Sequence, residues 1–151
     1  MLPVEQNKIK NSAEIISYVE KNNFRWVDRD LETKIGYSRF QTLYGDDMDQ
    51  SLKDLIFQNL NKELKIINKF VQIQKYNPGD YILPHKDHVQ LITKLHLFTL
   101  TTSKVDGLTC EYKDKFYKIP DIAGQYIDFP MFSWHWVNPV QDKRYSLVIG
   151  E

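Results

Sequence analysis

The sequence has one cysteine, Cys110, among its 151 residues, which excludes an internal disulfide. Twenty basic residues balance twenty acidic ones, so no overall positive field attracts nucleic acid or anionic lipid. No apolar run approaches the roughly 20 residues that span a bilayer, and the first residues lack the apolar core of a secretory signal. We therefore expect a soluble cytoplasmic protein with no membrane partner, and the charge balance disfavours a nucleic-acid partner.

The amino-acid composition is typical of one globular domain. Hydrophobic residues make up 42%, charged residues 26% and aromatic residues 13% of the chain, so neither disorder nor a fibrous repeat is indicated. We expect a single domain over residues 1–151, in which 1–69 form helical support and a possible lid and 70–151 form a β core. Cys110 alternates with Leu108 and Tyr112, a pattern typical of one strand face, and this predicts a buried, unreactive thiol.

Two helices are expected in the first part of the chain. Asn11 and Glu14 form a capping pair before apolar residues at helical spacing, which predicts a helix of about ten residues. Asp47 and Gln50 open a second helix, the strongest in the chain. Its apolar positions recur at steps of three and four residues and are Met48, Leu52, Leu55, Ile56, Leu60 and Leu64.

The apolar residues of the segment between the two expected helices do not recur at a regular spacing. Residues 24–27 predict a short strand, and residues 29–47 predict a loop region that contains another strand. Three aromatic residues, Tyr37, Phe40 and Tyr44, fall in this irregular part. They are candidates for a lid over a binding site, and ordinary core packing is the equal alternative.

From residue 70 onward the pattern changes to short β-rich runs separated by turn residues. About eight strands are expected, at 70–76, 81–87, 95–102, 108–112, 116–119, 125–129, 135–140 and 144–149. Turn signals at 77–80, 105–107, 121–124 and 138–139 separate them. This favours a mainly β fold in which two N-terminal helices flank a compact, jelly-roll-like barrel.

Three of these residues could bind one metal ion. His85 and Asp87 are two apart at an expected strand end, so their side chains leave the same face, and His135 opens a later strand. Two imidazoles and one carboxylate on one face of an octahedron leave three open positions, which is typical of oxygen-activating iron(II). A lone His-X-Asp triplet often occurs without metal, and His135 could be an ordinary core histidine. The combination nevertheless predicts a metal site.

A second pair follows His135 by nine residues. Arg144 and Ser146 share one face of an expected strand, where arginine offers a planar fork for a carboxylate and serine adds a hydroxyl donor. Only four of the twenty basic residues are arginines, which argues against a generic surface cation, although a surface salt bridge is the alternative. The pair predicts a binding site for the distal carboxylate of a dicarboxylic acid.

The remaining histidines and the neighbouring tryptophans are weaker candidates for residues of the site. His88 should point away from Asp87, toward the rim or the surface. His96 lies in an alternating run and should face either a cavity or solvent. Trp134 and Trp136 should project opposite to His135, which makes them packing residues rather than substrate contacts.

These residues, in this order, resemble the 2-oxoglutarate and iron(II)-dependent oxygenase superfamily. The matching segments are residues 76–87, 124–129, 135–140 and 144–146, and the resemblance covers roughly 70–151. It implies a double-stranded β-helix, iron(II) as metal, and 2-oxoglutarate and O2 as co-substrates. The site residues it implies are the metal ligands His85, Asp87 and His135 and the 2-oxoglutarate contacts Arg144, Ser146 and Tyr76.

The sequence also departs from two branches of that superfamily. Prolyl-hydroxylase relatives often have a paired glycine after the third strand and a lysine for the co-substrate, whereas residues 106–108 hold one glycine and the cation is Arg144. The run 76–87 also resembles AlkB-type demethylases, which carry a second arginine six residues after the first, where this chain has Gly150. The departure at Gly150 makes nucleobase demethylation the weaker alternative.

The sequence thus predicts a 2-oxoglutarate-dependent dioxygenase that hydroxylates a peptidyl or small-molecule substrate. Two other classes remain open. A metal hydrolase would use the same three ligands to activate water, although no additional general base is evident beside them. A non-catalytic interaction module would keep the metal without using 2-oxoglutarate. The substrate and the oligomeric state are not determined by these patterns.

Overall fold

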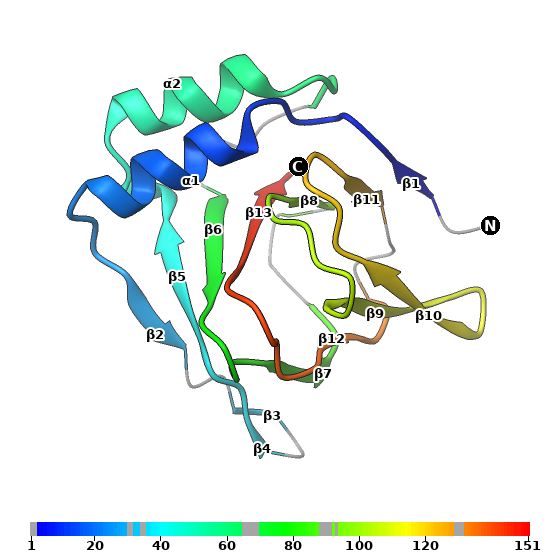
Figure 1. Cartoon of the computed structure of the whole chain (residues 1–151). Helices are drawn as coiled ribbons and strands as arrows, with labels where there is room; N and C mark the ends of the chain where they lie inside the picture. The colour runs from blue at the N-terminus through cyan, green and yellow to red at the C-terminus, as the bar shows by residue number, and fades with distance from the viewer. Residues whose placement is uncertain are drawn as a thin grey trace.

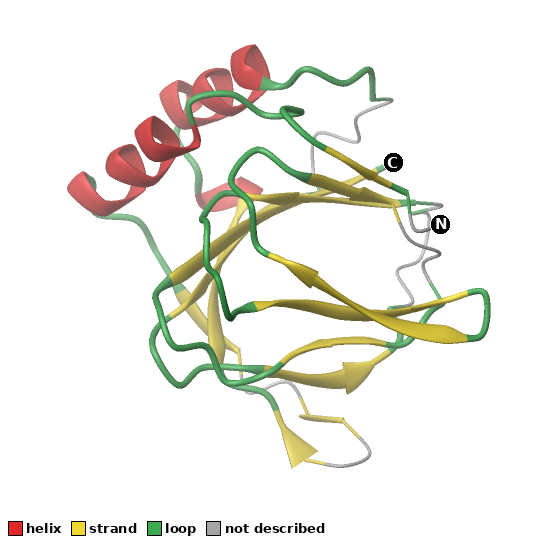
Figure 2. Cartoon of the chain, turned by 45° about the vertical axis from the view of Figure 1, so that its right-hand side comes forward, coloured by secondary structure: helices red, strands yellow, loops and turns green. Residues whose placement is uncertain are grey.

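Among the residues that it describes, the computed structural model of the chain contains two larger antiparallel sheets, a two-stranded hairpin and two α-helices (Figure 1). It describes residues 3–29, 32–33, 36–64, 70–87, 92, 94–128 and 132–151, with only the backbone described at 32–33 and 36–37. Figure 2 shows the two sheets facing each other, with the helices outside the larger sheet. This mainly β arrangement is consistent with a jelly-roll-like core. No helix in the described ranges is long and apolar enough to cross a membrane.

The larger sheet has seven strands within the described part of the chain. In spatial order they are β1 (Val4–Glu5), β11 (Tyr126–Asp128), β8 (Leu95–Thr99), β13 (Arg144–Gly150), β6 (Val71–Tyr76), β5 (Phe40–Tyr44) and β2 (Val27–Arg29). Three of these strands, β1, β5 and β2, precede residue 70. The β core therefore crosses the expected boundary at residue 69, because strands from the first part of the chain extend the sheet at both edges.

The smaller sheet has four strands among the described residues. In spatial order they are β10 (Lys115–Pro120), β9 (Gly107–Tyr112), β12 (His135–Val137) and β7 (Ile82–His85). A separate two-stranded hairpin consists of β3 (Glu32–Thr33) and β4 (Gly36–Tyr37). All eight strands expected after residue 70 are confirmed, with ends shifted by a few residues, whereas the strand expected at 24–27 begins at Val27.

Strands β6 and β13 lie next to each other in the larger sheet and are covered on both faces. Successive side chains of a strand point to opposite faces. One face presents aliphatic residues, including Ile73 and Leu147, to a core cluster shared with the helices. The other face presents Gln74 and Arg144 to a cavity between the two sheets. The alternation of apolar and polar residues in 71–76 therefore separates a structural face from a site-forming face.

The helices pack on the outer face of the larger sheet. Helix α1 (Ser12–Lys21) contributes Ile15 and Val19, and α2 (Gln50–Asn59) contributes Leu52 and Ile56, to the cluster that contains Ile73 and Leu147. Burying one such aliphatic side chain contributes about 1.5–3 kcal/mol, so this layer fixes the helices on the sheet. A short 3₁₀ helix (Gly45–Asp47) connects β5 to α2.

Both helices were expected, but their N-terminal caps differ from the sequence prediction. Asn11 is the N-cap residue of α1, but its side chain forms no capping hydrogen bond, and its amide donates to Asn59 Oδ1 at 2.9 Å. The cap of α2 is Asp49 rather than Asp47, and its carboxylate accepts from the backbone N–H of Leu52 at 2.8 Å. Leu60 and Leu64 lie beyond the end of α2 and pack against the same core cluster.

Candidate metal and co-substrate site

A tight turn leads from β6 into β7, an edge strand of the smaller sheet. Asp80 holds the turn closed, because its carboxylate accepts from the backbone N–H of Asn77 at 2.9 Å and from Arg39 Nε at 2.8 Å. Gly79 adopts a φ of 91°, a conformation that favours glycine. The chain then reverses from β6 in the larger sheet to β7 in the smaller one. His85 is the last residue of β7, and Asp87 follows two residues later.

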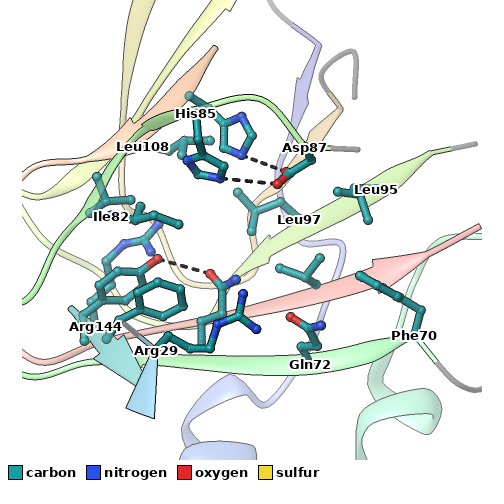
Figure 3. A pocket seen from close by; sticks show the side chains of 16 residues that line it. Arg29, Phe70, Gln72, Ile82, His85, Asp87, Leu95, Leu97, Leu108 and Arg144 are labelled. Atoms are coloured by element: carbon teal, nitrogen blue, oxygen red, sulfur yellow. Dashed lines mark hydrogen bonds and ion pairs between the residues drawn. The ribbon is translucent and has the colours of Figure 1, made fainter. Parts of the chain in front are cut away.

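The structure brings His85, Asp87 and His135 together. Strands β7 and β12 are antiparallel neighbours, and His135 lies directly opposite His85 in their register. The two imidazole centroids are 4.2 Å apart, and one ligand atom from each of the three residues lies within 4.8 Å of the others. Figure 3 shows the His85 imidazole directed toward the Asp87 carboxylate, which His135 Nε2 also contacts. Their joint role as metal ligands remains a prediction, and their convergence is the geometry that this role requires.

Backbone carbonyls orient both imidazoles. His85 Nδ1 lies 2.7 Å from the carbonyl oxygen of Leu83, and His135 Nδ1 lies 2.9 Å from that of Ser133. A proton on each Nδ1 donates to these carbonyls and directs Nε2 inward, as metal-binding histidines usually require. The Nε2 atoms of His85 and His135 lie 3.3 and 2.9 Å from the Asp87 carboxylate.

The Asp87 carboxylate lies between two imidazoles, and this shifts the pKa of two of the three groups. Burial by itself raises the pKa of Asp87, but hydrogen bonds and charge from His135 and His85 hold it far below its ordinary value. Burial lowers the pKa of His85, yet the hydrogen bond and charge of Asp87 produce a net increase. Asp87 is therefore ionised at neutral pH, and His85 retains a proton to a higher pH than an ordinary histidine.

Metal binding at these residues is expected to weaken as the pH falls. A metal ion needs the neutral Nε2 of His85, and the raised pKa means that a proton competes for it near neutral pH. Below that pKa the apparent Kd should rise about tenfold per pH unit for each proton displaced. Calorimetric titration with Mn²⁺ across roughly pH 6 to 8 measures this dependence. A constant affinity over that range would contradict the proton competition.

The triad lies on one wall of a cavity between the two sheets, with a volume of about 280 Å³ (Figure 3). Its other walls are mostly apolar. The aliphatic and aromatic lining residues are Phe40, Phe70, Ile82, Leu95, Leu97, Leu108, Val137 and Val148, and the polar or charged ones besides the triad are Arg29, Gln72, Gln74, Tyr76 and Arg144. This combination of apolar walls and a few polar groups is typical of small-molecule sites.

Arg144 lines the cavity but is paired with a carboxylate that the sequence analysis did not identify. Asp121 accepts from its Nε at 2.8 Å and from its Nη2 at 3.2 Å, and each side chain is no more than 3% exposed. The alternative of a surface salt bridge is therefore wrong, because the pair is buried. Asp121 fixes the guanidinium plane and leaves three N–H groups of Arg144, two on Nη1 and one on Nη2, that do not bond this carboxylate.

Ser146 and Tyr76 belong to the same polar group. The Ser146 hydroxyl donates to Gln74 Oε1 at 3.3 Å, and the Tyr76 hydroxyl donates to the same oxygen at 3.2 Å. The Arg144 guanidinium carbon lies 5.1 Å from the Tyr76 ring centroid. Burial raises the pKa of Tyr76 to about 12, so its hydroxyl is a neutral donor at physiological pH. The proposed co-substrate residues are thus adjacent, and Gln74 joins them.

The sequence analysis missed four residues of this site: Arg29, Gln72, Gln74 and Asp121. The alternation in 71–76 could have identified the two glutamines, because they share a strand face with Tyr76. Asp121 was interpreted only as part of a turn. Arg29 lies at the end of β2, in a segment without a clear period, and no local signal connected it to the metal ligands.

Other residues singled out by the sequence lie elsewhere. His96 is buried and faces neither cavity nor solvent, since its imidazole bonds the Tyr126 hydroxyl at 2.6 Å and Glu151 Oε2 at 2.5 Å. Trp134 is 39% exposed, and Trp136 packs on Phe116. His88 lies outside the described residues. Cys110 is buried as expected, and burial raises the pKa of its thiol to about 11.

Three aromatic residues, Tyr37, Phe40 and Tyr44, were candidates for a lid over the binding site, with core packing as the alternative. Phe40 is 3% exposed and forms a cavity wall, where its ring stacks on Tyr76 at a centroid distance of 5.3 Å. Tyr44 contacts Arg29. The side chain of Tyr37 lies outside the described residues. Phe40 therefore belongs to the core of the site, which is the packing alternative that the sequence left open.

No protein-family model matches the chain, and no curated protein matches it. Solved structures do match. A prolyl-4-hydroxylase from Pseudomonas putida has a TM-score of 0.67 and 16% identity, and the match covers 98% of this chain and 90% of that one. The alpha-ketoglutarate-dependent carbocyclase SnoK of nogalamycin biosynthesis has a TM-score of 0.64 and 10% identity, over 97% and 77% of the two chains.

A third match is the collagen prolyl hydroxylase of Paramecium Bursaria Chlorella virus-1, solved with 2-oxoglutarate. Its TM-score is 0.61 at 14% identity, and the match covers 98% of this chain and 93% of that one. Identities this low show a shared fold and not a shared substrate. The chain therefore has the fold of the 2-oxoglutarate and iron(II)-dependent oxygenases, which confirms the resemblance of its sequence to that superfamily at the level of the fold.

Proposed function

We propose that the protein is a non-haem iron(II) oxygenase that uses 2-oxoglutarate and O2 and hydroxylates a peptidyl or small-molecule substrate. One observation supports this most strongly. The imidazoles of His85 and His135 converge on the Asp87 carboxylate at the wall of a cavity that also contains Arg144. A metal ligand set and a carboxylate-binding cation thus face the same cavity.

The chemistry of the three side chains fits iron(II). Two neutral imidazole nitrogens and one carboxylate oxygen form the donor set of oxygen-activating iron sites. The carbonyls of Leu83 and Ser133 bond the Nδ1 atoms and so keep Nε2 available for the metal. When bound, iron(II) supplies the redox chemistry that couples the oxidation of 2-oxoglutarate to that of a substrate C–H bond.

The residues of the larger sheet hold and position 2-oxoglutarate in this proposal. Arg144 donates to the distal carboxylate through N–H groups that do not bond Asp121. The hydroxyls of Ser146 and Tyr76, which donate to Gln74 Oε1 in this structure, turn to donate to that carboxylate when it binds. Asp121 keeps the guanidinium in place before the co-substrate arrives, which reduces the ordering cost of binding. The aliphatic walls exclude water from the reacting groups.

The overall reaction converts a substrate C–H group, 2-oxoglutarate and O2 into the hydroxylated product, succinate and CO2. One oxygen atom of O2 enters succinate and the other enters the product. The chain contributes orientation and shielding rather than a further reactive group. Fold neighbours include two enzymes named as prolyl hydroxylases and one named as a carbocyclase of nogalamycin biosynthesis, so peptidyl and small-molecule substrates are both represented.

The proposal is tested with the purified protein, iron(II) and 2-oxoglutarate. We expect calorimetry under anaerobic conditions to show one 2-oxoglutarate bound per chain, and only when metal is present. Admission of O2 together with a substrate, or with ascorbate as the two-electron reductant in its place, should then release succinate and CO2 in equal amounts. Metal binding without 2-oxoglutarate binding would indicate an interaction module, and zinc-dependent hydrolysis indifferent to O2 would indicate a hydrolase.

Ser146→Ala is expected to weaken 2-oxoglutarate binding about 3- to 10-fold. The substitution removes one hydroxyl donor from the proposed carboxylate site, and a hydrogen bond of this kind contributes about 0.5–1.5 kcal/mol. Calorimetry on the metal-loaded variant measures the Kd. Tyr145→Phe is the matched control, because it removes a hydroxyl from the opposite face of β13, where Tyr145 bonds Glu20. Equal effects of the two substitutions on Kd would place Ser146 outside the binding site.

A further inference from the structure

The cavity contains a second guanidinium, that of Arg29. It extends from the last residue of β2, opposite Phe40 in the register with β5, and lines the same volume as His85 and Asp87 (Figure 3). Strand β2 is at the edge of the larger sheet and comes from the part of the chain that precedes the matching segments. The function proposed above assigns no role to Arg29.

Aromatic side chains hold Arg29 in place. Its guanidinium carbon lies 5.9 Å from the Phe40 ring centroid and 5.8 Å from the Tyr44 ring centroid. Its Nη1 donates to the Tyr44 hydroxyl. Such contacts orient a guanidinium without cancelling its charge, because the rings and the phenol are neutral. The side chain is thus fixed in position and still cationic.

The other arginines near the site have carboxylate partners, and Arg29 has none among the described residues. Arg144 is paired with Asp121, and Arg39 is paired with Asp80. Asp87 lines the cavity too, but its carboxylate bonds the two imidazoles and would be used by a metal. Within the described ranges, no carboxylate is therefore left to pair with Arg29, and a partly dry environment makes such a cation favour an anion.

Two stacked rings separate the two guanidinium groups. Arg144 lies over Tyr76, Tyr76 stacks on Phe40 with 16° between the ring planes, and Arg29 lies over Phe40. In the sheet order, β6 and β5 lie between β13 and β2, so the backbones of β13 and β2 are about 14 Å apart along the sheet. Because the two guanidinium groups contact different rings and come from strands that are not neighbours, we infer that they are separate anion-binding positions and that the distal carboxylate of one 2-oxoglutarate occupies only one of them.

We propose that Arg29 binds a carboxylate of the oxidised substrate, so that the substrate is a small carboxylic acid such as a free amino acid. This inference rests on the function proposed above and specifies its substrate class. Arginine matches a carboxylate with two parallel donors, and Gln72 and Gln74 on the adjacent cavity wall add amide groups. A cavity volume of about 280 Å³ is close to the lower end of the range for small-molecule sites, which fits a small acid.

The experiment compares acids with their neutral analogues. A panel of free L-amino acids and the corresponding amino acid amides is titrated into iron(II)-loaded, 2-oxoglutarate-bound protein without O2, and binding is measured by calorimetry and by the shift in Tm. At least one acid should bind wild-type protein tenfold or more tightly than its amide. Equal binding of acid and amide across the panel, or no binding of any acid, overturns the proposal.

Variants of two nearby arginines complete the test. Arg29→Gln should remove the preference for the acid, and Arg29→Lys should keep the preference with a weaker affinity, because the positive charge is retained. Arg25→Gln is the matched control, since Arg25 is exposed in the same segment and does not line the cavity. A preference that survives Arg29→Gln overturns the proposal.

The affinity for 2-oxoglutarate separates this inference from the proposed function. We expect Arg29→Gln to change the Kd of 2-oxoglutarate less than twofold. A loss of tenfold or more would assign Arg29 to the co-substrate and overturn the substrate proposal, while the oxygenase function would stand. Failure of wild-type protein to bind 2-oxoglutarate would instead overturn the proposed function itself.

Discussion

His135→Ala is expected to reduce iron(II) affinity at least about 100-fold and to abolish succinate formation. His135 supplies one of three proposed ligand atoms, and loss of even an outer partner of a metal ligand typically costs 10- to 100-fold in affinity. The remaining His85 and Asp87 would bind the ion weakly. Calorimetry with Mn²⁺ and the metal content of the purified variant measure the change.

His96→Gln is the control for the loss of a buried histidine. His96 bonds Tyr126 and Glu151 in the larger sheet and does not line the cavity. This variant should bind metal as wild-type protein does, even if its Tm falls. Unchanged metal affinity in His135→Ala would contradict the proposed ligand set, and circular dichroism of both variants establishes that they are folded.

Asp121→Ala is expected to lower the free energy of unfolding by about 3–5 kcal/mol. The substitution leaves the Arg144 guanidinium buried without its carboxylate, and breaking one side of a buried ion pair has a cost of this size. For a domain of this length the loss corresponds to a decrease in Tm of roughly 6 to 20 °C. Asp121→Asn should lower the free energy of unfolding by less, because an amide oxygen can still accept one hydrogen bond from Arg144.

Two further variants show whether the loss of stability in Asp121→Ala arises from the unpaired charge of Arg144. Asp121→Leu combined with Arg144→Met removes both charges, and it should recover most of the stability while eliminating 2-oxoglutarate binding. Arg39→Gln breaks the pair with Asp80, in which the Arg39 side chain is 62% exposed, and should change stability by no more than about 1 kcal/mol. Similar losses for Asp121→Ala and Arg39→Gln would show that burial does not determine the effect.

The β-rich part of the fold was predictable because its signals are local. Each strand after residue 70 is a short alternating run bounded by turn residues, and these features depend on nearest neighbours. The spacing of His85 and Asp87 likewise determined that both side chains leave one face. The arrival of His135 opposite His85 depends on sheet topology, and the order of family motifs rather than the physics of the segment suggested it.

The structural features that the sequence analysis did not predict depend on contacts between distant segments of the chain. Asp121 and Arg144 are 23 residues apart in sequence, and nothing in the turn at 121–124 indicates that its first side chain enters the core. The addition of β5 and β2 to the larger sheet was equally hidden, because these strands are short and irregular in pattern. The side-chain capping bond expected at α1 is absent, and the Asn11 side chain instead contacts a distant residue, Asn59.

The two sheets divide the proposed chemistry between them. Strands β7 and β12 of the smaller sheet carry the two histidine ligands, whereas the larger sheet carries Arg144 and Arg29. The spacing between the sheets is set by aliphatic side chains such as Leu97 and Leu108, which contact no ion and donate no hydrogen bond from their side chains. If the proposed function holds, the volume of these residues should affect which substrate carbon is oxidised, so we expect regioselectivity to change with it.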